Sequence, residues 1–299
     1  MREEKSIPLV SVAIVTYNQK EYLRECIESV LAQDYKNIEI VVADDFSTDG
    51  TQNMLKEYDN QYQNKFVLKL SEKNQGITAN SNLAHFACNG KYIAWMGGDD
   101  LMLPGKIRKQ VEYMEKNPEC TICYHNLDVF QSETNKTLYY FNSKNKYEGD
   151  VHVAIKHGTF NGACSNMLRA NKIPKHAFHE TIPVASDWLY WVETLRNGGT
   201  INYIDEVLGR YRRHENNVTK KTISISQNSI DHLNSCNIIL SLNPNYYNAV
   251  MFKYANDLLN LRYKLPYFKT TLTSFLISPD IKKFIRLGLY IVSFGKVKK

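Results

Sequence analysis

The sequence has 299 residues, of which 43% are hydrophobic and 23% are charged. This composition is typical of a globular protein and excludes a disordered or collagen-like chain. The mean hydropathy is −0.42, and no long uninterrupted apolar run occurs, so the sequence predicts no membrane-spanning helix. Six scattered cysteines are too few for a disulfide framework and lead us to expect a reducing cytoplasm.

Charge is unevenly distributed along the chain. The formal net charge is +6, whereas residues 261–299 hold nine Lys or Arg and one acid, Asp280, for a net +8. The remaining 260 residues therefore sum to −2. This balance predicts no nucleic-acid-binding surface on the body of the protein, and it suits the C-terminal segment to an anionic surface.

The first half of the chain alternates predicted strands with predicted helices. Short runs rich in β-branched residues indicate four buried strands, the first of which we interpret as a strand and not as a signal peptide. These runs are Leu9–Val15, Ile38–Ala43, Phe66–Leu70 and Lys91–Met96. Apolar residues at helical spacing follow each run, in residues 23–31, 54–58, 78–88 and 105–117.

Two of these helices carry finer expectations. Asn18 and Glu21 have the spacing of a capping box at the start of the first helix. In the third helix, Leu83, Phe86 and Ala87 are expected to face the core.

The second half of the chain is mixed and then mostly helical. Strands are expected in four further segments, and a helix is expected over Ser186–Arg196. In this helix Trp188 and Trp191 either belong to the core or line one side of a binding site. The strand segments are Thr121–Phe130, Thr137–Phe141, Asn161–Arg169 and Tyr203–Tyr211. Residues 224–299 have a predominantly helical pattern. Together these elements predict an α/β fold with a mainly parallel sheet, helices on both faces and a C-terminal helical extension.

Polar residues follow each of the four N-terminal strands. They are Thr16–Asn18, Asp44–Asp49, Asn74–Gly76 and Asp99–Asp100. Because ligands bind beyond the carboxyl ends of the strands in such sheets, we expect a binding site at this edge. The sequence contains neither the dinucleotide-binding G-x-G-x-x-G turn nor a P-loop, so those two kinds of site are disfavoured.

Several of these side chains have two interpretations. Asp99 and Asp100 suit a hard divalent ion such as Mg²⁺ or Mn²⁺ that also binds a diphosphate, or they form a solvated turn with a helix-capping Asp. Asp44 and Asp45 either accept hydrogen bonds from a base or ribose or form an Asx turn. Tyr17 either stacks on a base or is buried near its loop.

Four segments, in this order and spacing, resemble the family 2 glycosyltransferases. They are Val10–Asn18, Asp44–Thr51, Asn74–Gly76 and Gly98–Asp100 with Pro104. The resemblance covers residues 8–215. It implies the GT-A fold of nucleotide-diphospho-sugar transferases and an inverting hexosyltransferase of the kind that assembles bacterial surface polysaccharides.

The resemblance also implies roles for single residues. Tyr17 and Asp45 match the positions that hold uracil or another pyrimidine. Asp99 and Asp100 match the motif that touches the ribose and the divalent ion. Asp187 matches the catalytic base, although an acid at a helix N-terminus is also favoured by the helix dipole alone.

The segment Leu208–His214 resembles the part of the family that lies near the diphosphate. Arg212 and Arg213 are therefore expected to include a phosphate contact, the alternative being a solvated basic strand end. The whole expected substrate-binding set is Thr16, Tyr17, Asn18, Asp45, Asn74, Gly76, Asp99, Arg212 and Arg213.

The sequence departs from the family pattern at three places. Gly97 stands where the family often has Asp, so metal binding is expected to rest on Asp99, Asp100 and His214. The segment Asn80–Asn82 lacks an Arg that the family often has, and Ser186 replaces a Glu before Asp187.

The expected reaction is transfer from a nucleotide-diphosphate sugar, most simply a UDP-sugar, to a hydroxyl of a glycan or lipid-linked oligosaccharide. One rival is a nucleotidyl transferase or cyclase that uses Gly97–Asp100, which is disfavoured because Leu101–Pro104 leads into a helix instead of a second strand. The other rival is a non-catalytic scaffold, for which Gly97 is the only argument.

We expect a catalytic domain over residues 1–215, with a nucleotide-sugar half (1–118) and an acceptor half (119–215), and a helical extension over 216–299. The predicted helix Ile281–Gly295 has one apolar face flanked by basic residues. It either lies on anionic lipid at the inner face of the plasma membrane or packs on protein. The histidines, His176 and His179 among them, show no spacing typical of a metal site.

Overall fold

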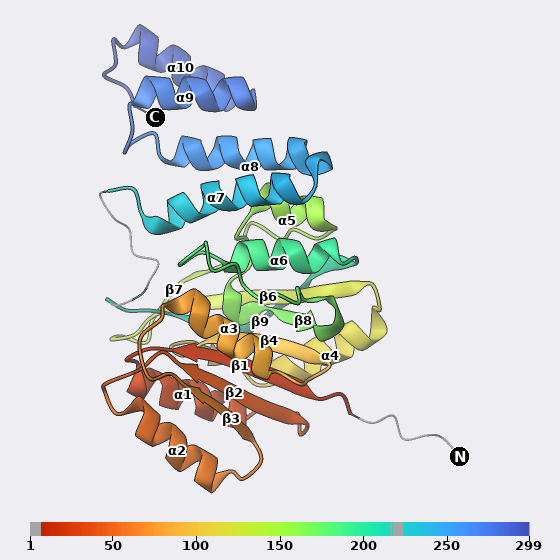
Figure 1. The fold of residues 1–299 in the computed structure, drawn as a ribbon. Helices are drawn as coiled ribbons and strands as arrows, with labels where there is room; N and C mark the ends of the chain where they lie inside the picture. The colour runs from red at the N-terminus through yellow and green to blue at the C-terminus, as the bar shows by residue number, and fades with distance from the viewer. Residues whose placement is uncertain (1–6, 216, 218–223, 299) are drawn as a thin grey trace.

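The computed structural model describes residues 7–215, 217 and 224–298, and its centre is a nine-stranded mixed sheet (Figure 1). The strand order is β3-β2-β1-β4-β8-β6-β9-β5, and β7 pairs with β6. The strands are β1 (Val10–Thr16), β2 (Ile38–Asp44), β3 (Phe66–Leu70), β4 (Tyr92–Gly97), β5 (Leu101–Met102), β6 (Cys120–Gln131), β7 (Thr137–Tyr140), β8 (Met167–Arg169) and β9 (Thr200–Arg213).

Helices cover both faces of this sheet and continue beyond it. They are α1 (Lys20–Leu31), α2 (Thr51–Gln61), α3 (Ile77–Ala87), α4 (Lys106–Lys116), α5 (Val151–His157), α6 (Asp187–Arg196), α7 (Gln227–Leu242), α8 (Tyr247–Asn260), α9 (Tyr267–Ile277) and α10 (Ile281–Val292). These bounds confirm the predicted alternation of strands and helices in the first half of the chain.

The parallel part of the sheet is buried on both faces because successive side chains of a strand point to opposite sides. Val12 and Ile14 of β1 pack in one cluster with apolar residues of α1, α2 and α4. Ala13 packs in the other cluster with residues of α3 and α6. This explains why these strands read as continuous apolar runs in the sequence.

Antiparallel pairing enters the sheet at β8, β7 and β5. Strands β3, β2, β1 and β4 are parallel, and so are β6 and β9, whereas β8 pairs antiparallel with β4 and β6. The predicted strand Asn161–Arg169 is extended only at Met167–Arg169. Its first part is a 3₁₀ turn held by Asn166, whose side-chain amide donates to the carbonyl of Gly162 at 3.1 Å.

The C-terminal helices α7, α8, α9 and α10 form a stack, in that order, on the side of the sheet that α5 and α6 cover (Figure 1). Trp188, at the start of α6, is fully buried, and its indole nitrogen donates to the carbonyl of Ala154 at 3.0 Å. Trp188 and Trp191 are therefore core residues. The proposed domain boundary at residue 216 lies outside the described residues.

Two local predictions are wrong. Asn18 does not cap α1, whose cap residue is Gln19; it adopts a positive φ of 50° and accepts a hydrogen bond from the backbone nitrogen of Thr48 instead. Phe86 is 66% exposed because it lies on the outer side of α3, away from the sheet.

In the part of the chain that the structure describes, no helix combines the length and apolarity needed to cross a bilayer. Helix α10 instead exposes much of its apolar surface, with Phe284 60% and Val292 80% accessible. Lys283, one of the basic residues of this predicted helix, points inward and donates to the carbonyl of Ser278 at 2.7 Å.

Candidate functional site

The polar clusters lie at one edge because the strands that precede them end in register. Thr16 pairs with Asp44 across β1 and β2, and Val15 pairs with Gly97 across β1 and β4. Hydrogen bonds continue past the strand ends, from Asp45 N to the Thr16 carbonyl (3.1 Å) and from the Gly98 nitrogen to the Val15 carbonyl (2.9 Å). The loops after three strands are thereby fixed side by side.

The two acids after β2 do different things. Asp44 is fully buried and accepts hydrogen bonds from the Ser47 nitrogen and the Gln52 amide, both at 2.9 Å. It therefore makes the Asx-type turn that was one of the two alternatives. Asp45 accepts the backbone nitrogens of Gln75 (2.8 Å) and Gly76 (2.9 Å) and so joins the loop after β3 to the same edge.

The loop after β1 is tied to the loop after β2. The Asn18 nitrogen donates to the Ser47 hydroxyl at 2.7 Å, and the ring of Tyr17 stays 47% exposed. Tyr17 is thus not buried near its loop. Asn74 is exposed on the neighbouring loop.

Beneath these loops, Asn80 connects two strand ends. Its amide donates to the carbonyls of Ala43 (2.9 Å) and Thr16 (3.3 Å). The segment Asn80–Asn82, which lacks an Arg that the family often has, therefore begins with a residue that holds the edge of the sheet together. Among the described residues, the buried hydroxyl of Thr16 and the amide oxygen of Asn80 find no hydrogen-bond partner.

Asp99 and Asp100 form a turn directly after β4. Asp99 Oδ2 accepts hydrogen bonds from His214 Nε2 (2.9 Å) and the Asn217 amide (3.2 Å), and Asp100 Oδ1 accepts from the Arg212 nitrogen (3.0 Å). The second oxygens of both carboxylates face Gly97: a Cβ at that glycine would lie 2.8 Å from Asp99 Oδ1 and 3.2 Å from Asp100 Oδ2.

This geometry gives Gly97 a positive role. A Cβ there would crowd Asp99 Oδ1 and lie close to Asp100 Oδ2, so the glycine lets both oxygens keep their present positions. Burial, and next the negative charge of Asp99, raise the pKa of the Asp100 carboxyl. Two convergent carboxylate oxygens that repel each other suit a hard divalent cation.

Arg212 is held by the protein itself. It is 4% exposed, its Nε donates to the Asp99 carbonyl at 2.7 Å, and its Nη2 pairs with Glu25 at 2.5 Å. The guanidinium also lies 4.7 Å from the ring centroid of Tyr22. Arg212 therefore positions the Asp99–Asp100 turn in this structure, and the basic pair splits into one structural residue and Arg213, which is less buried.

Asp187 is the first residue of α6 and lies near the loop after β3. The hydroxyl of Ser186, its neighbour, is 3.0 Å from that of Thr78, which is two residues beyond Gly76. Asp187 Oδ1 accepts the nitrogen of Trp188 at 2.8 Å. Burial raises the pKa of the Asp187 carboxyl, while the nearby His232 acts in the opposite direction.

Two residues of this site were not expected from the sequence. Asn217 positions Asp99. Asp231, in α7, is fully buried and accepts the nitrogens of Val184 (2.9 Å) and Ala185 (2.8 Å), directly before Asp187. Neither belongs to a motif, because each acts on a segment distant in the sequence.

The hairpin required for a cyclase-like site is not formed by the residues after Asp100. Leu101–Met102 forms β5, which pairs antiparallel with β9 and not with β4. The chain then enters α4. This removes the structural basis for the nucleotidyl transferase alternative.

Comparison with known proteins adds independent information. The model of "Glycosyl transferase family 2" matches residues 11–175. An uncharacterized glycosyltransferase of Haemophilus influenzae is 33% identical over 227 residues, which are 71% of this chain and 68% of that protein. The chain spans 60% of the length of uncharacterized mycobacterial proteins that it matches at 29% identity.

Two solved structures share the fold. Staphylococcus aureus TarS 1–349 in complex with UDP-GlcNAc superposes with a TM-score of 0.68 at 16% identity, over 96% of this chain and 92% of that one. The mannosyltransferase PcManGT of Pyrobaculum calidifontis in complex with GDP-Man and Mn²⁺ gives 0.66 at 14% identity, over 97% and 81%.

Proposed function

The chain belongs to glycosyl transferase family 2, and on that premise we propose that it transfers a hexosyl group from a UDP-sugar to a hydroxyl of a glycan or lipid-linked acceptor, with inversion at the anomeric carbon. The observation that carries the proposal is the placement of Asp45 and the Asp99–Asp100 pair at the carboxyl ends of β2 and β4, with Ser186, the neighbour of Asp187, in hydrogen-bond contact with Thr78 just beyond the loop that Asp45 holds. This is the place where α/β sheets bind their ligands.

In the proposed complex the nucleotide base lies against Tyr17. The exposed ring of Tyr17 offers a flat face for stacking, and Asp45 is held at the same edge by its bonds to Gln75 and Gly76. Thr16, Asn18 and Asn74 complete the proposed donor-binding surface. A UDP donor is supported by the complex of TarS with UDP-GlcNAc, whereas PcManGT was solved with GDP-Man.

Asp99 and Asp100 are the proposed ligands of Mg²⁺ or Mn²⁺. Their fit rests on the two oxygens that converge over Gly97, since oxygen ligands are those that both ions prefer. His214 was expected to be a third ligand; its Nε2 bonds to Asp99 Oδ2, which supports a role in orienting that carboxylate. When bound, the ion would neutralise negative charge on the diphosphate.

Arg213 is the proposed phosphate contact of the basic pair. Its guanidinium lies 4.8 Å from the ring centroid of Tyr211, at the end of β9 that adjoins the Asp99–Asp100 turn. A charge-assisted hydrogen bond from Arg213 would stabilise the leaving diphosphate. Arg212 acts indirectly, by holding the backbone of Asp99.

Asp187 is the proposed base. It would remove the proton of the acceptor hydroxyl while that oxygen attacks the anomeric carbon and the bond to the diphosphate breaks. General base catalysis contributes ~10²–10⁴-fold in rate. Burial raises the pKa of Asp187, which makes its carboxylate a stronger base than an exposed Asp.

We extend the proposal to location and domain organisation. Residues 1–215 would form the catalytic domain, in nucleotide-sugar (1–118) and acceptor (119–215) halves, and residues 216–299 an extension. The exposed apolar face of α10, flanked by the exposed Lys282, supports peripheral contact with anionic lipid at the cytoplasmic face of the membrane. Such contact suits a lipid-linked acceptor in polysaccharide assembly.

The direct experiment is a donor panel. The purified chain is incubated with UDP-, dTDP- and GDP-sugars and Mn²⁺, and release of the nucleoside diphosphate is measured with and without glycan acceptors. We expect turnover of a UDP-sugar above the dTDP and GDP donors. Turnover of GDP-sugars alone would contradict the proposal that the donor carries uracil. Turnover of no donor would contradict the proposed glycosyl transfer.

A further inference from the structure

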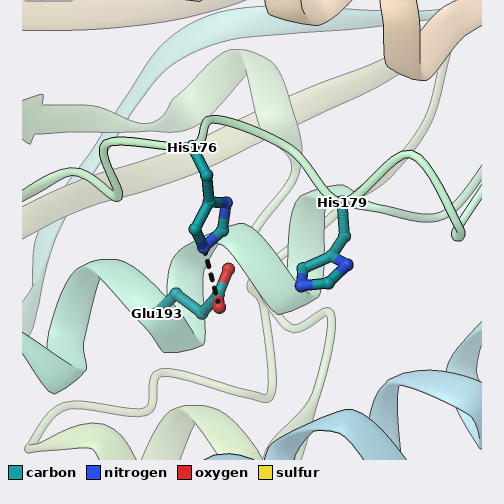
Figure 2. Close-up of side chains that lie close together, drawn as sticks. All are labelled: His176, His179 and Glu193. Carbon is teal, nitrogen blue, oxygen red and sulfur yellow. Dashed lines mark ion pairs between the residues drawn. The ribbon is translucent and has the colours of Figure 1, made fainter.

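A second group of metal-ligating side chains lies outside the site described above. His176 and His179, in the loop before α6, point toward Glu193 on that helix (Figure 2). One ligand atom from each lies within 4.8 Å of the other two. We propose that these three side chains bind a divalent transition-metal ion of the zinc class.

Glu193 supplies the first argument. Its side chain is 3% exposed, its Oε1 lies 3.2 Å from His176 Nε2, and its Oε2 is buried with no hydrogen-bond partner among the described residues. Leaving a buried charged oxygen without a partner is costly, and a bound cation would remove that cost. One oxygen of this carboxylate, Oε2, therefore lacks a partner among the described residues, and a bound cation would supply one.

The tautomer of His176 supplies the second argument. Its Nδ1 lies 3.0 Å from the carbonyl of Ala177, which can only accept, so Nδ1 carries the proton. With Nδ1 engaged in this way, Nε2 is the ring nitrogen that faces the Glu193 carboxylate, in position to share a cation with it. A backbone carbonyl bound to the second ring nitrogen is also typical of metal-binding histidines.

The loop that holds the two histidines is fixed before any ion binds. Asn82 accepts the backbone nitrogen of Phe178 at 2.8 Å and donates to its carbonyl at 3.2 Å. The Phe178 ring stacks on Tyr190 of α6 at 4.0 Å and 4°. Ala177, which lies between the two histidines in the sequence, is buried and has a φ of 64°, a conformation rare for a residue with a side chain. The surroundings therefore hold the histidines in place at some cost in backbone strain.

The donor set identifies the class of ion. Two imidazole nitrogens and one carboxylate oxygen suit Zn²⁺, Co²⁺ or Ni²⁺, whereas Mg²⁺ prefers oxygen ligands only. Tetrahedral Zn²⁺ with bonds of about 2.0–2.1 Å separates its ligand atoms by about 3.3 Å. The His176–Glu193 distance of 3.2 Å already matches this, and rotation of the partly exposed His179 ring would bring its nitrogen closer.

The bound ion would fasten the loop before α6 to that helix. Glu193 lies six residues after Asp187, about 9 Å along the helix axis. The ion would thus stabilise the helix that carries the proposed base without touching the reacting atoms. The proposal does not depend on the proposed reaction.

The test is calorimetric titration of the EDTA-treated full chain with Zn²⁺ in excess Mg²⁺, which occupies oxygen-ligand sites. We expect one Zn²⁺ per chain, and at least a tenfold weaker affinity in His179→Ala and in Glu193→Gln. The matched control is His152→Ala, because His152 also pairs with a carboxylate, Asp150 at 3.1 Å, on an exposed surface, yet belongs to no group of three metal-ligating side chains among the described residues. Its affinity should equal that of the wild type.

Three results would overturn the proposal: no stoichiometric binding to the wild type, wild-type affinity in both variants, or an equal loss in His152→Ala. Circular dichroism checks that each variant is folded. If Glu193→Gln unfolds, His179→Ala alone decides, because His179 lies in a partly exposed loop. Co²⁺ provides a second readout, since intense visible absorption that disappears in His179→Ala reports four-coordinate binding at this site.

Discussion

At the scale of single residues, acids of similar sequence context have very different tasks. Asp44 and Asp45 are adjacent, yet the first closes its own turn and the second holds the loop after β3. Asp99 and Asp100 are both anchored through one oxygen and leave the other facing Gly97. The sequence predicted that these acids meet at one edge, but not which oxygen of each would be engaged by the protein.

Asp187 is the residue on which the proposed chemistry depends. Asp187→Asn keeps the shape of the side chain and removes its basicity, so we expect transfer to fall ~10²–10⁴-fold while UDP-sugar binding is retained. The measurements are initial rates of transfer and calorimetric donor binding. Asp150→Asn is the matched control, because Asp150 is also a helix N-terminal acid, at α5.

The pH dependence of the wild type gives a second readout for Asp187. The base must be ionised, so activity is lost as pH falls through its pKa. Since burial raises that pKa, the acidic limb should lie above the pH expected for an ordinary Asp, about 4. A full rate in Asp187→Asn would refute the assignment.

At the scale of secondary-structure elements, the helical extension contributes to the site from outside the motifs. Asp231 of α7 accepts two backbone nitrogens just before α6, and Gln227 of the same helix donates to its other oxygen at 2.7 Å. The first turn of α6, and with it Asp187, is therefore positioned by a residue 44 positions later in the chain.

This contact predicts a positioning role for Asp231. Asp231→Ala leaves the backbone nitrogens of Val184 and Ala185 without this acceptor, and misplacement of the base should lower kcat ~10- to 100-fold with little change in donor affinity. Asp231→Asn should restore most of the rate because its amide oxygen can accept both donors. An equal loss in both variants, or a change confined to donor binding, would contradict the positioning role.

Helix α10 can be tested in the same way. Phe284→Glu and Ile285→Glu place a charge on its exposed apolar face, so we expect both to weaken sedimentation with anionic vesicles at least tenfold. Tyr247→Glu is the control, because Tyr247 is an exposed apolar residue on α8. Equal binding by all variants, or no binding by the wild type, would exclude this helix as the membrane contact.

At the scale of the whole molecule, the sequence predicted the parallel half of the sheet better than the rest. Runs such as Phe66–Leu70 are short, apolar and bounded by polar turns, so period and composition are enough to locate them. The strand predicted over residues 161–169 is too long, because local pattern does not reveal the 3₁₀ turn that Asn166 stabilises. Local pattern also does not show which helix face meets the sheet, hence the error at Phe86.

The candidate site divides along the same line. Motif order located Asp45, Asp99 and Asp187, whereas the partners Asn217 and Asp231 depend on contacts between distant segments. The resemblance of Leu208–His214 led us to expect a phosphate contact from Arg212 or Arg213. It could not show that Arg212 pairs with Glu25, which lies 187 positions away in the sequence. The histidine pair has no spacing typical of a metal site in the sequence, because the third side chain of the proposed site, Glu193, belongs to a separate helix.

The most direct test of the central claim, that the acids at this sheet edge bind a nucleotide sugar through a cation, is calorimetric titration of UDP with and without Mn²⁺. We expect Mn²⁺ to strengthen UDP binding to the wild type, and Asp99→Asn to abolish that gain. The control is Asp205→Asn, because Asp205 is an exposed acid of β9 that pairs with Lys146. This variant should behave as the wild type. UDP binding of equal strength without Mn²⁺ and in Asp99→Asn would contradict the account.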